Sequence, residues 1–241
     1  MAFPADLARA ASDAFGIPEP TTRQIHRTLQ PEGLIASGGR GRSAAKMGVG
    51  DVASMTYGCM WWPAPITVAP QYVAACHTLV AARVPMVDIP VNTNWDEFQE
   101  CRTSKWPAEI DGALLRIPGL ATLPEGHSLS AALDAVLSFL AENPAPWDGT
   151  RYTIVELHLY SPLPKARLVL ECWDTESWAR QRHQVAYFLP DLASLVHSSL
   201  EFEVRSMEVG TEKYPWAVGK ASRRATASLR ELSIIADTLN K

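Results

Sequence analysis

The chain has 241 residues, of which 47% are hydrophobic, and a formal net charge of −4 at pH 7. A chain of this length and composition can bury a sizeable core, which excludes an intrinsically disordered protein. The sequence contains no run of eighteen apolar residues and no apolar leader near its start, so we expect a cytoplasmic protein with no membrane partner.

Two short helices are predicted first. Residues 4–15 place apolar side chains on one stripe, with Pro4 in the first turn and Gly16 just past the end. A second helix is expected over 21–30, with Thr21 or Thr22 as its N-cap and Pro31 as its terminator. We expect this helix to turn Ile25, Thr28 and Leu29 inward and to expose Arg23, Gln24, His26, Arg27 and Gln30.

The segment after the second helix suggests a wing. Gly33 suits a helix C-terminal turn, residues 34–36 suit a short strand, and a glycine-rich basic loop over 38–46 follows. Helix, turn, polar helix, strand and basic loop is the order of elements in a winged helix-turn-helix.

Positive charge is concentrated in this part of an acidic protein. Between Thr21 and Met47 there are five cations and a single acid, Glu32, which is the footprint of a surface that faces phosphates. Arginines flanked by glycine suit the DNA minor groove, and Arg and Gln side chains on a helix read base edges. The predicted DNA-binding residues are Thr21, Thr22, Arg23, Gln24, His26, Arg27, Arg40, Gly41, Arg42, Ser43 and Lys46.

Other readings of these residues have less support. Ser43 and Lys46 form a Ser-x-x-Lys pattern, but the accompanying motifs of penicillin-binding enzymes are missing, and no phosphate-binding loop motif occurs. A metal site would first use Cys76 and His77, yet the cysteines form no C-x-x-C pair. We therefore predict no enzyme, no cofactor and no metal. The plain alternative is a solvated helix face followed by a loose surface turn.

The rest of the chain predicts helices and then strands. Helices are expected from about Asp51, over 69–83 and over 127–143, with mostly loop over 84–127. Alternating apolar residues predict an antiparallel hairpin of 151–160 and 166–173, strands at 184–190 and 201–209 around a short helix, and a closing helix from about Ser222.

These elements indicate an α+β protein of three parts. The expected domains are a winged helix-turn-helix over 1–47, a mainly helical middle over 48–145, and an α+β domain over 150–241 whose antiparallel sheet is covered by a helix. We expect the last domain to dimerise the chain or to contact a protein partner.

The segment TTRQIHRTLQPEGLIASGGRGR resembles the DNA-reading part of winged-helix regulators of the GntR and related types. This resemblance implies that Thr22, Arg23 and Arg27 approach bases or phosphates and that Arg40 and Arg42 lie in the wing. The layout of the first eighty residues is also similar to that of helix-turn-helix proteins encoded in bacterial prophages and prophage-like elements, which implies mobile-element biology.

We therefore expect a transcriptional regulator that binds double-stranded DNA, with a dimer on a palindromic site. One alternative is a phage-type DNA packaging protein, a terminase small subunit that oligomerises on DNA. Another is a C-terminal binding module anchored by Trp173, Trp178 and Trp216. The oligomeric state in solution distinguishes the regulator from the packaging protein.

Overall fold

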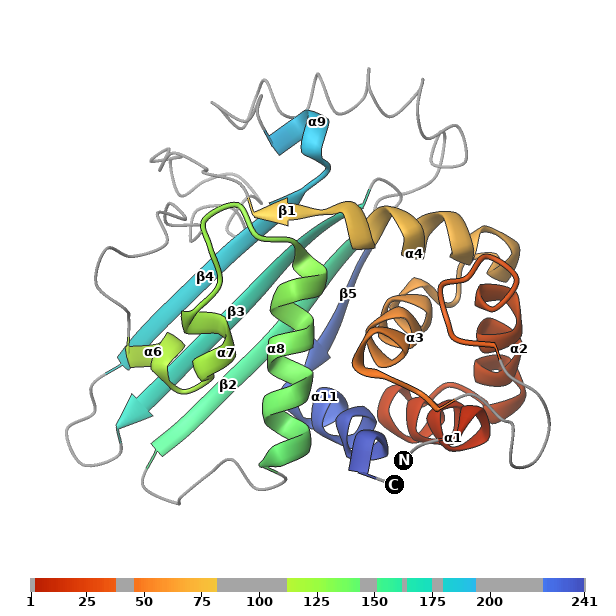
Figure 1. The fold of residues 1–241 in the computed structure, drawn as a ribbon, viewed down its shortest axis with the longest axis horizontal. Coiled ribbons are helices and arrows are strands. Elements are labelled where there is room, and N and C mark those ends of the chain that lie inside the picture. Colours follow the sequence, from red (N-terminus) through yellow and green to blue (C-terminus); the bar gives the residue numbers. More distant parts are fainter. Residues whose placement is uncertain are drawn as a thin grey trace.

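The computed structural model describes residues 3–37, 46–81, 112–143, 151–161, 164–174, 180–193 and 223–240. The protein is α+β, as predicted, with a five-stranded antiparallel sheet and helices packed on one of its faces and beside its edge (Figure 1). One continuous cluster of buried side chains runs from Leu7 in the first helix to Ala236 near the C-terminus. Residues from all three predicted domains therefore share a core.

The first two helices confirm the start of the prediction and correct one boundary. Helix α1 covers Pro4–Phe15 and ends at Gly16, whose φ of 63° is left-handed, a conformation that glycine adopts without strain. Helix α2 covers Glu19–Leu29. It starts before Thr21 because Pro18 is its N-cap and Pro20 occupies its first turn, where proline needs no hydrogen-bond acceptor. The predicted threonine N-cap is wrong.

The segment after α2 makes a turn but no strand. Gly33 has a φ of 70°, and the N–H of Leu34 donates to the carbonyl oxygen of Leu29, which completes the predicted C-terminal turn. Residues 34–36 are bends and coil, so the predicted wing strand is wrong. Ile35 is buried instead, and the Ala36 N–H donates to a side chain of the next helix. The basic loop over 38–45 lies outside the described residues.

Two central helices follow. Helix α3 covers Val49–Trp61 and is buried on every side from Val52 onward. After a short 3-10 turn, η2 (Ile66–Val68), helix α4 covers Ala69–Thr78. The chain then becomes extended, and Val80–Ala81 form strand β1, where the sequence predicted more helix. These two residues pair with β4 at the edge of the sheet, which gives their backbone groups partners outside the helix.

Three helices lie within 112–143. Helices α6 (Gly112–Leu115) and α7 (Pro118–Ala121) are single turns, and α8 covers Leu129–Glu142. The hydroxyl oxygen of Ser128 caps α8 by accepting from the Ala131 N–H at 3.1 Å. In Figure 1, α8 lies across the sheet. One apolar stripe of α8 is buried, namely Leu129, Leu133, Val136, Leu137 and Leu140.

The sheet has the strand order β1-β4-β3-β2-β5. Strands β2 (Arg151–Ser161) and β3 (Lys165–Asp174) form the predicted hairpin, with Leu157 opposite Leu168, and β4 covers Arg180–Phe188. A single helical turn, α9 (Pro190–Ala193), follows β4. The predicted strand over 201–209 and the rest of the helix predicted over 191–200 lie outside the described residues.

The C-terminal element differs from its prediction in its first part. Residues Arg223–Ser228 form strand β5, which pairs with β2, and only then does helix α11 run over Leu229–Ala236, followed by a last 3-10 turn, η4 (Asp237–Asn240). Ala227 is buried while Thr226 is exposed, which is the period-two pattern of a strand. The Ser228 N–H donates to the Glu231 carboxylate, and this capping box starts the helix at Leu229. No helix within the described ranges is both long and apolar enough to cross a membrane.

Candidate functional site

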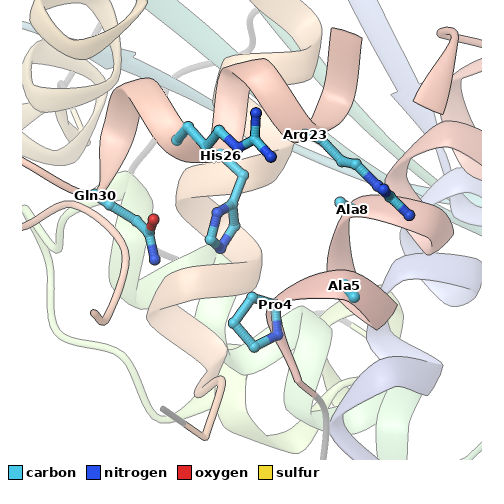
Figure 2. Close-up of a pocket in the computed structure, with 7 residues that line it drawn as sticks. Pro4, Ala5, Ala8, Arg23, His26 and Gln30 are labelled. Carbon is cyan, nitrogen blue, oxygen red and sulfur yellow. The ribbon is translucent and has the colours of Figure 1, made fainter. Parts of the chain in front are cut away.

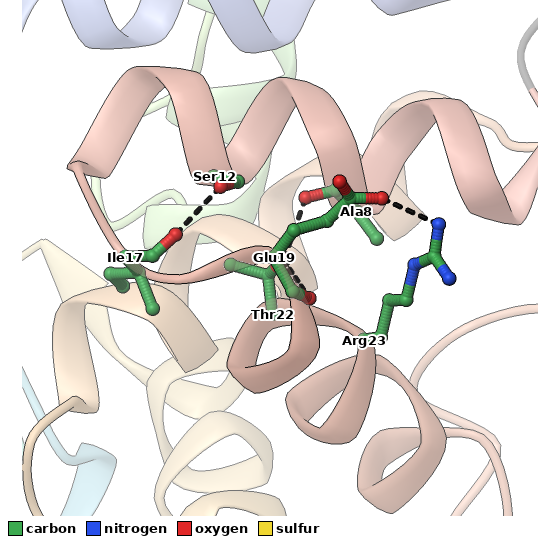
Figure 3. A network of polar contacts seen from close by, with 6 residues as sticks. All are labelled: Ala8, Ser12, Ile17, Glu19, Thr22 and Arg23. Atoms are coloured by element: carbon green, nitrogen blue, oxygen red, sulfur yellow. Dashed lines mark hydrogen bonds and ion pairs between the residues drawn. The ribbon is translucent and has the colours of Figure 1, made fainter.

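Helices α1 and α2 form a tightly joined pair at the N-terminal end of the fold. Three residues separate them, Gly16, Ile17 and Pro18, and Ile17 is buried in the core. The hydroxyl of Ser12 donates to the Ile17 carbonyl oxygen at 2.6 Å, and that of Thr22 donates to the Ala8 carbonyl oxygen at 2.8 Å (Figure 3). A short turn that contains a glycine thus joins two packed helices.

Helix α3 also packs against the buried face of α2. A Cβ at Gly58 of α3 would lie 2.7 Å from Ile25 Cγ2 and 3.2 Å from Leu29 Cδ1. Two helices approach this closely only where one of them has no side chain at the contact. Contacts with α1 and α3 therefore fix the orientation of α2, and hence which of its residues face outward.

The exposed side of α2 carries three of the predicted site residues. Arg23, Gln24 and Arg27 are exposed, and Thr21 is half-buried. The guanidinium of Arg23 forms an ion pair with Glu19 one turn earlier, at 2.5 Å, whereas the described residues give Arg27 no such pair. Thr28, expected inside, is half-buried and donates its hydroxyl to the Gln24 carbonyl oxygen.

Two predicted site residues are not on this surface. Thr22 is fully buried and its hydroxyl is used within the protein, so it does not reach a phosphate. His26 is only 5% exposed, because its ring turns from α2 toward α1. Both side chains were expected to be exposed, and both of these predictions are wrong. The buried positions of α2 are Thr22, Ile25, His26 and Leu29.

A pocket of about 300 Å³ opens between the two helices (Figure 2). Helix α1 contributes only the small apolar residues Pro4, Ala5 and Ala8 to its lining. Helix α2 contributes every polar group of the described lining: Arg23, His26, Arg27 and Gln30. All four side chains carry N–H groups, so the polar side of the pocket is rich in hydrogen-bond donors.

His26 is the most enclosed polar residue of the pocket. Its Nε2 is buried and has no hydrogen-bond partner in the described part of the protein. Burial is the main cause that lowers the pKa of His26; the nearby Arg27 lowers it further, while Asp51 acts in the opposite direction. The imidazole is therefore neutral near pH 7 and has an unused ring nitrogen.

One carboxylate joins the two ends of the basic loop. Asp51, in the first turn of α3, accepts from the Ala36 N–H at 2.6 Å and from the Gly48 N–H at 2.7 Å. The chain between these two residues includes Lys46, which is exposed, and the predicted site residues Arg40, Gly41, Arg42 and Ser43, which lie outside the described residues. The loop thus starts and ends next to α2 and α3.

Comparisons with protein-family models, with curated proteins and with solved structures returned no match. The function is therefore inferred from the site's own geometry.

A second polar cluster, which no sequence motif indicated, lies between α3, α4 and α8. The hydroxyl oxygen of Ser54 is 2.8 Å from His77 Nε2, and that of Ser130 is 2.7 Å from His77 Nδ1. Ser54 is 1% exposed, so a substrate cannot reach its hydroxyl. Ser130 and His77 are half-buried, and the cluster links the three helices. Sequence patterns could not reveal it because its members come from three separate helices.

Cys76 and His77, the residues considered for a metal site, do not belong to a ligand set within the described part of the chain. Burial raises the pKa of the Cys76 thiol, which disfavours the thiolate that a metal needs, and the ring nitrogens of His77 face two serines. In the described ranges, no group of three or more His, Cys, Asp or Glu side chains is placed to hold a metal ion. Trp178, Trp216 and the side chain of Trp173 lie outside the described part of the protein.

Proposed function

We propose that the protein binds double-stranded DNA through the outer face of α2. The observation that carries this proposal is the row formed by Arg23, Gln24 and Arg27, three exposed side chains on a helix that is held from behind by α1 and α3. A rigid helix that presents Arg and Gln side chains can read guanine and adenine edges or bind phosphates.

The dimensions of α2 suit this role. An α-helix with its side chains is about 10–12 Å in diameter and the major groove of B-DNA is about 12 Å wide, so one face of this 11-residue helix can be accommodated there. Arg27 is available for a phosphate or a base, because no described carboxylate pairs with it. Arg23 is available at little cost, because its ion pair with Glu19 is exposed to solvent.

The basic loop adds a second contact region to the proposal. Asp51 brings both ends of the loop next to α2 and α3, and the loop sequence contributes Arg40, Arg42 and Lys46. Arginines beside glycines suit the minor groove next to a helix in the major groove. We propose that the loop binds there, although the predicted wing strand does not form.

We further propose that the protein acts as a regulator and that a pair of chains binds a two-fold symmetric DNA site. Light scattering of the protein with and without duplex DNA measures this. A dimer supports the regulator, and a ring of eight or more chains supports a packaging role instead.

Fluorescence anisotropy with genomic duplex fragments tests DNA binding. Because each phosphate contact contributes about 0.9 to the slope of log affinity against log salt, Arg23→Gln with Arg27→Gln should reduce that slope by about two and the affinity by about tenfold or more. Arg9→Gln is the control, since Arg9 is an exposed arginine of α1 that lies outside the row. Unchanged affinity and slope in the double variant would overturn the role of α2.

A separate variant tests the loop. Arg40→Ala with Arg42→Ala should weaken binding and flatten its salt dependence if the loop contacts the duplex. Equal affinity of this variant and the wild-type protein would limit the interface to α2.

A further inference from the structure

The pocket between α1 and α2 has an uneven lining that points to a particular ligand chemistry. Its α1 side is small and apolar, and its α2 side places two guanidinium groups, an imidazole and an amide around one opening. The described lining contains no carboxylate. A lining with two cationic side chains and an excess of donors over acceptors favours a ligand that carries acceptor atoms and negative charge.

His26 provides the second, independent observation. Its side chain is 95% buried, it extends from α2 toward Pro4 in Figure 2, and its Nε2 has no partner among the described residues. Buried polar atoms are nearly always hydrogen-bonded in folded proteins, so an orphaned one at a pocket requires an explanation. Nε2 itself has less than 1 Å² of accessible surface, so an oxygen atom of a ligand supplies the missing partner only when the ring turns toward the pocket.

We propose that this pocket is an oxyanion site that binds a phosphate group, with Arg27 and His26 as its main ligands. Arg27 contributes a charge that no described carboxylate neutralises. Arg23 contributes less, because Glu19 competes for its guanidinium. Gln30, whose side-chain amide makes a long 3.4 Å contact with the Ala36 carbonyl oxygen, can turn its N–H toward the ligand instead.

The volume of the pocket allows two sources for this phosphate. At about 300 Å³ it is at the lower limit of small-molecule sites and larger than a phosphate ion alone. The group could be a backbone phosphate of a DNA duplex bound to α2, or the phosphate of a small phosphorylated ligand. The site itself does not depend on the proposed DNA binding, since its geometry lies within one chain.

The imidazole resonances of His26 provide a direct readout. We expect saturable shifts of these resonances when inorganic phosphate is added to the full chain, and none when potassium chloride is added to the same ionic strength. The His26 signals are assigned by their absence in His26→Gln. Affinity for phosphate should fall about tenfold or more in Arg27→Gln, because a charge-assisted hydrogen bond is lost, and should stay within about twofold in Arg9→Gln.

Sulfate tests the role of the imidazole, because its charge is constant between pH 5.5 and 8. Protonated His26 donates from both ring nitrogens, so sulfate should bind more tightly at the lower pH. The charged groups near the ring are Arg23 and Arg27 on α2 and Asp51 on α3. In His26→Gln the dependence of sulfate affinity on pH should disappear.

A duplex of about 20 base pairs distinguishes the two sources. If DNA provides the phosphate, the duplex shifts the same His26 resonances and inorganic phosphate competes with it. If a small ligand provides it, phosphate shifts His26 and the duplex does not. Failure of DNA binding alone leaves the phosphate result intact, so the two proposals fail separately. Absence of any His26 shift with phosphate and with duplex, or phosphate affinity unchanged in Arg27→Gln, would overturn the site.

Discussion

The hydroxyl of Thr22 donates a hydrogen bond to the carbonyl oxygen of Ala8, 14 residues earlier in the chain, at 2.8 Å. This bond crosses from α2 to α1 in a fully buried position and fixes how far α2 is rotated about its axis. The rotation decides that Arg23, Gln24 and Arg27 face outward and that His26 faces the pocket. A threonine thus sets the geometry of the proposed binding surface without touching a ligand.

Thr22→Val tests this bond. Valine keeps the shape of the side chain and removes the hydroxyl, so we expect the free energy of unfolding to fall by about 1 kcal/mol. Thr22→Ser keeps the hydroxyl and should retain the interhelical bond, although it loses a methyl group. Urea denaturation of both variants measures the difference, and a valine variant as stable as the wild type would contradict the importance of the bond.

Gly58→Ala should strain the contact between α2 and α3. The added Cβ would come within 2.7 Å of Ile25 Cγ2, so side chains or helices must shift, at a cost of about 1–3 kcal/mol. Gly50→Ala in the same helix is the matched control. Nothing lies within 4 Å of a Cβ there, and alanine favours a helix by up to about 1 kcal/mol over glycine. The midpoint of thermal denaturation should therefore fall in Gly58→Ala and rise in Gly50→Ala.

Asp51→Asn should loosen the base of the basic loop. The amide has only one acceptor oxygen for the two backbone N–H groups of Ala36 and Gly48, and it removes a negative charge from the first turn of α3. We expect a loss of about 1–3 kcal/mol in stability. Asp13→Asn on the exposed side of α1 removes the same charge as a control. Equal unfolding midpoints for both variants would contradict this role of Asp51.

Asp51→Asn also separates stability from function. If the loop contributes to DNA binding, the variant should bind duplex DNA more weakly even at temperatures where it is fully folded, because the loop ends are less constrained. Anisotropy measurements at low temperature, with circular dichroism to establish folding, check this outcome. Wild-type affinity in the folded variant would remove the loop's anchoring from the proposed interface.

The sequence predicted an element correctly where the spacing of its apolar residues followed a single period. Helix α8 and the hairpin of β2 and β3 were predicted because their apolar residues follow a single period over ten or more positions. Strand β5 was misassigned because its six residues contain only small and polar side chains around Ala227 and run directly into α11. The extended conformation of such a short segment is determined by its pairing with β2, and the local sequence does not encode this pairing.

The site on α2 shows a different limit of prediction from sequence. Positions 22, 25, 26 and 29 have the i, i+3, i+4, i+7 spacing of a buried stripe, but two of them are Thr22 and His26. Polarity alone assigns these residues to the outside. Their burial depends on a carbonyl oxygen of α1 for Thr22 and on the α1–α2 pocket for His26, and neither is visible before the helices pack. The exposure of Arg23, Gln24 and Arg27 was predicted correctly because arginine and glutamine side chains are mostly exposed in folded proteins.

From the buried histidines we predict that the protein is less stable in mild acid than at neutral pH. His127 is 5% exposed, and its ring nitrogens lie 2.9 Å from the Pro124 carbonyl oxygen and 2.9 Å from the Tyr187 hydroxyl oxygen. Burial lowers the pKa of His127, against the smaller opposing effect of the Pro124 carbonyl, and burial also lowers the pKa values of His26, His77 and His158. In the unfolded chain a histidine titrates near pH 6.5.

Below about pH 6.5 the unfolded chain therefore binds more protons than the folded one, and the free energy of unfolding falls with pH, by at most about 1.4 kcal/mol per pH unit for each proton. Urea denaturation between pH 8 and pH 5.5 measures this slope. Burial raises the pKa of Asp134, and this shift increases the free energy of unfolding as the pH falls, opposite to the effect of the histidines. His127→Gln removes one of the titrating groups and should make the slope shallower. Constant or increasing stability as the pH falls through 6.5 would contradict the neutral state of these histidines.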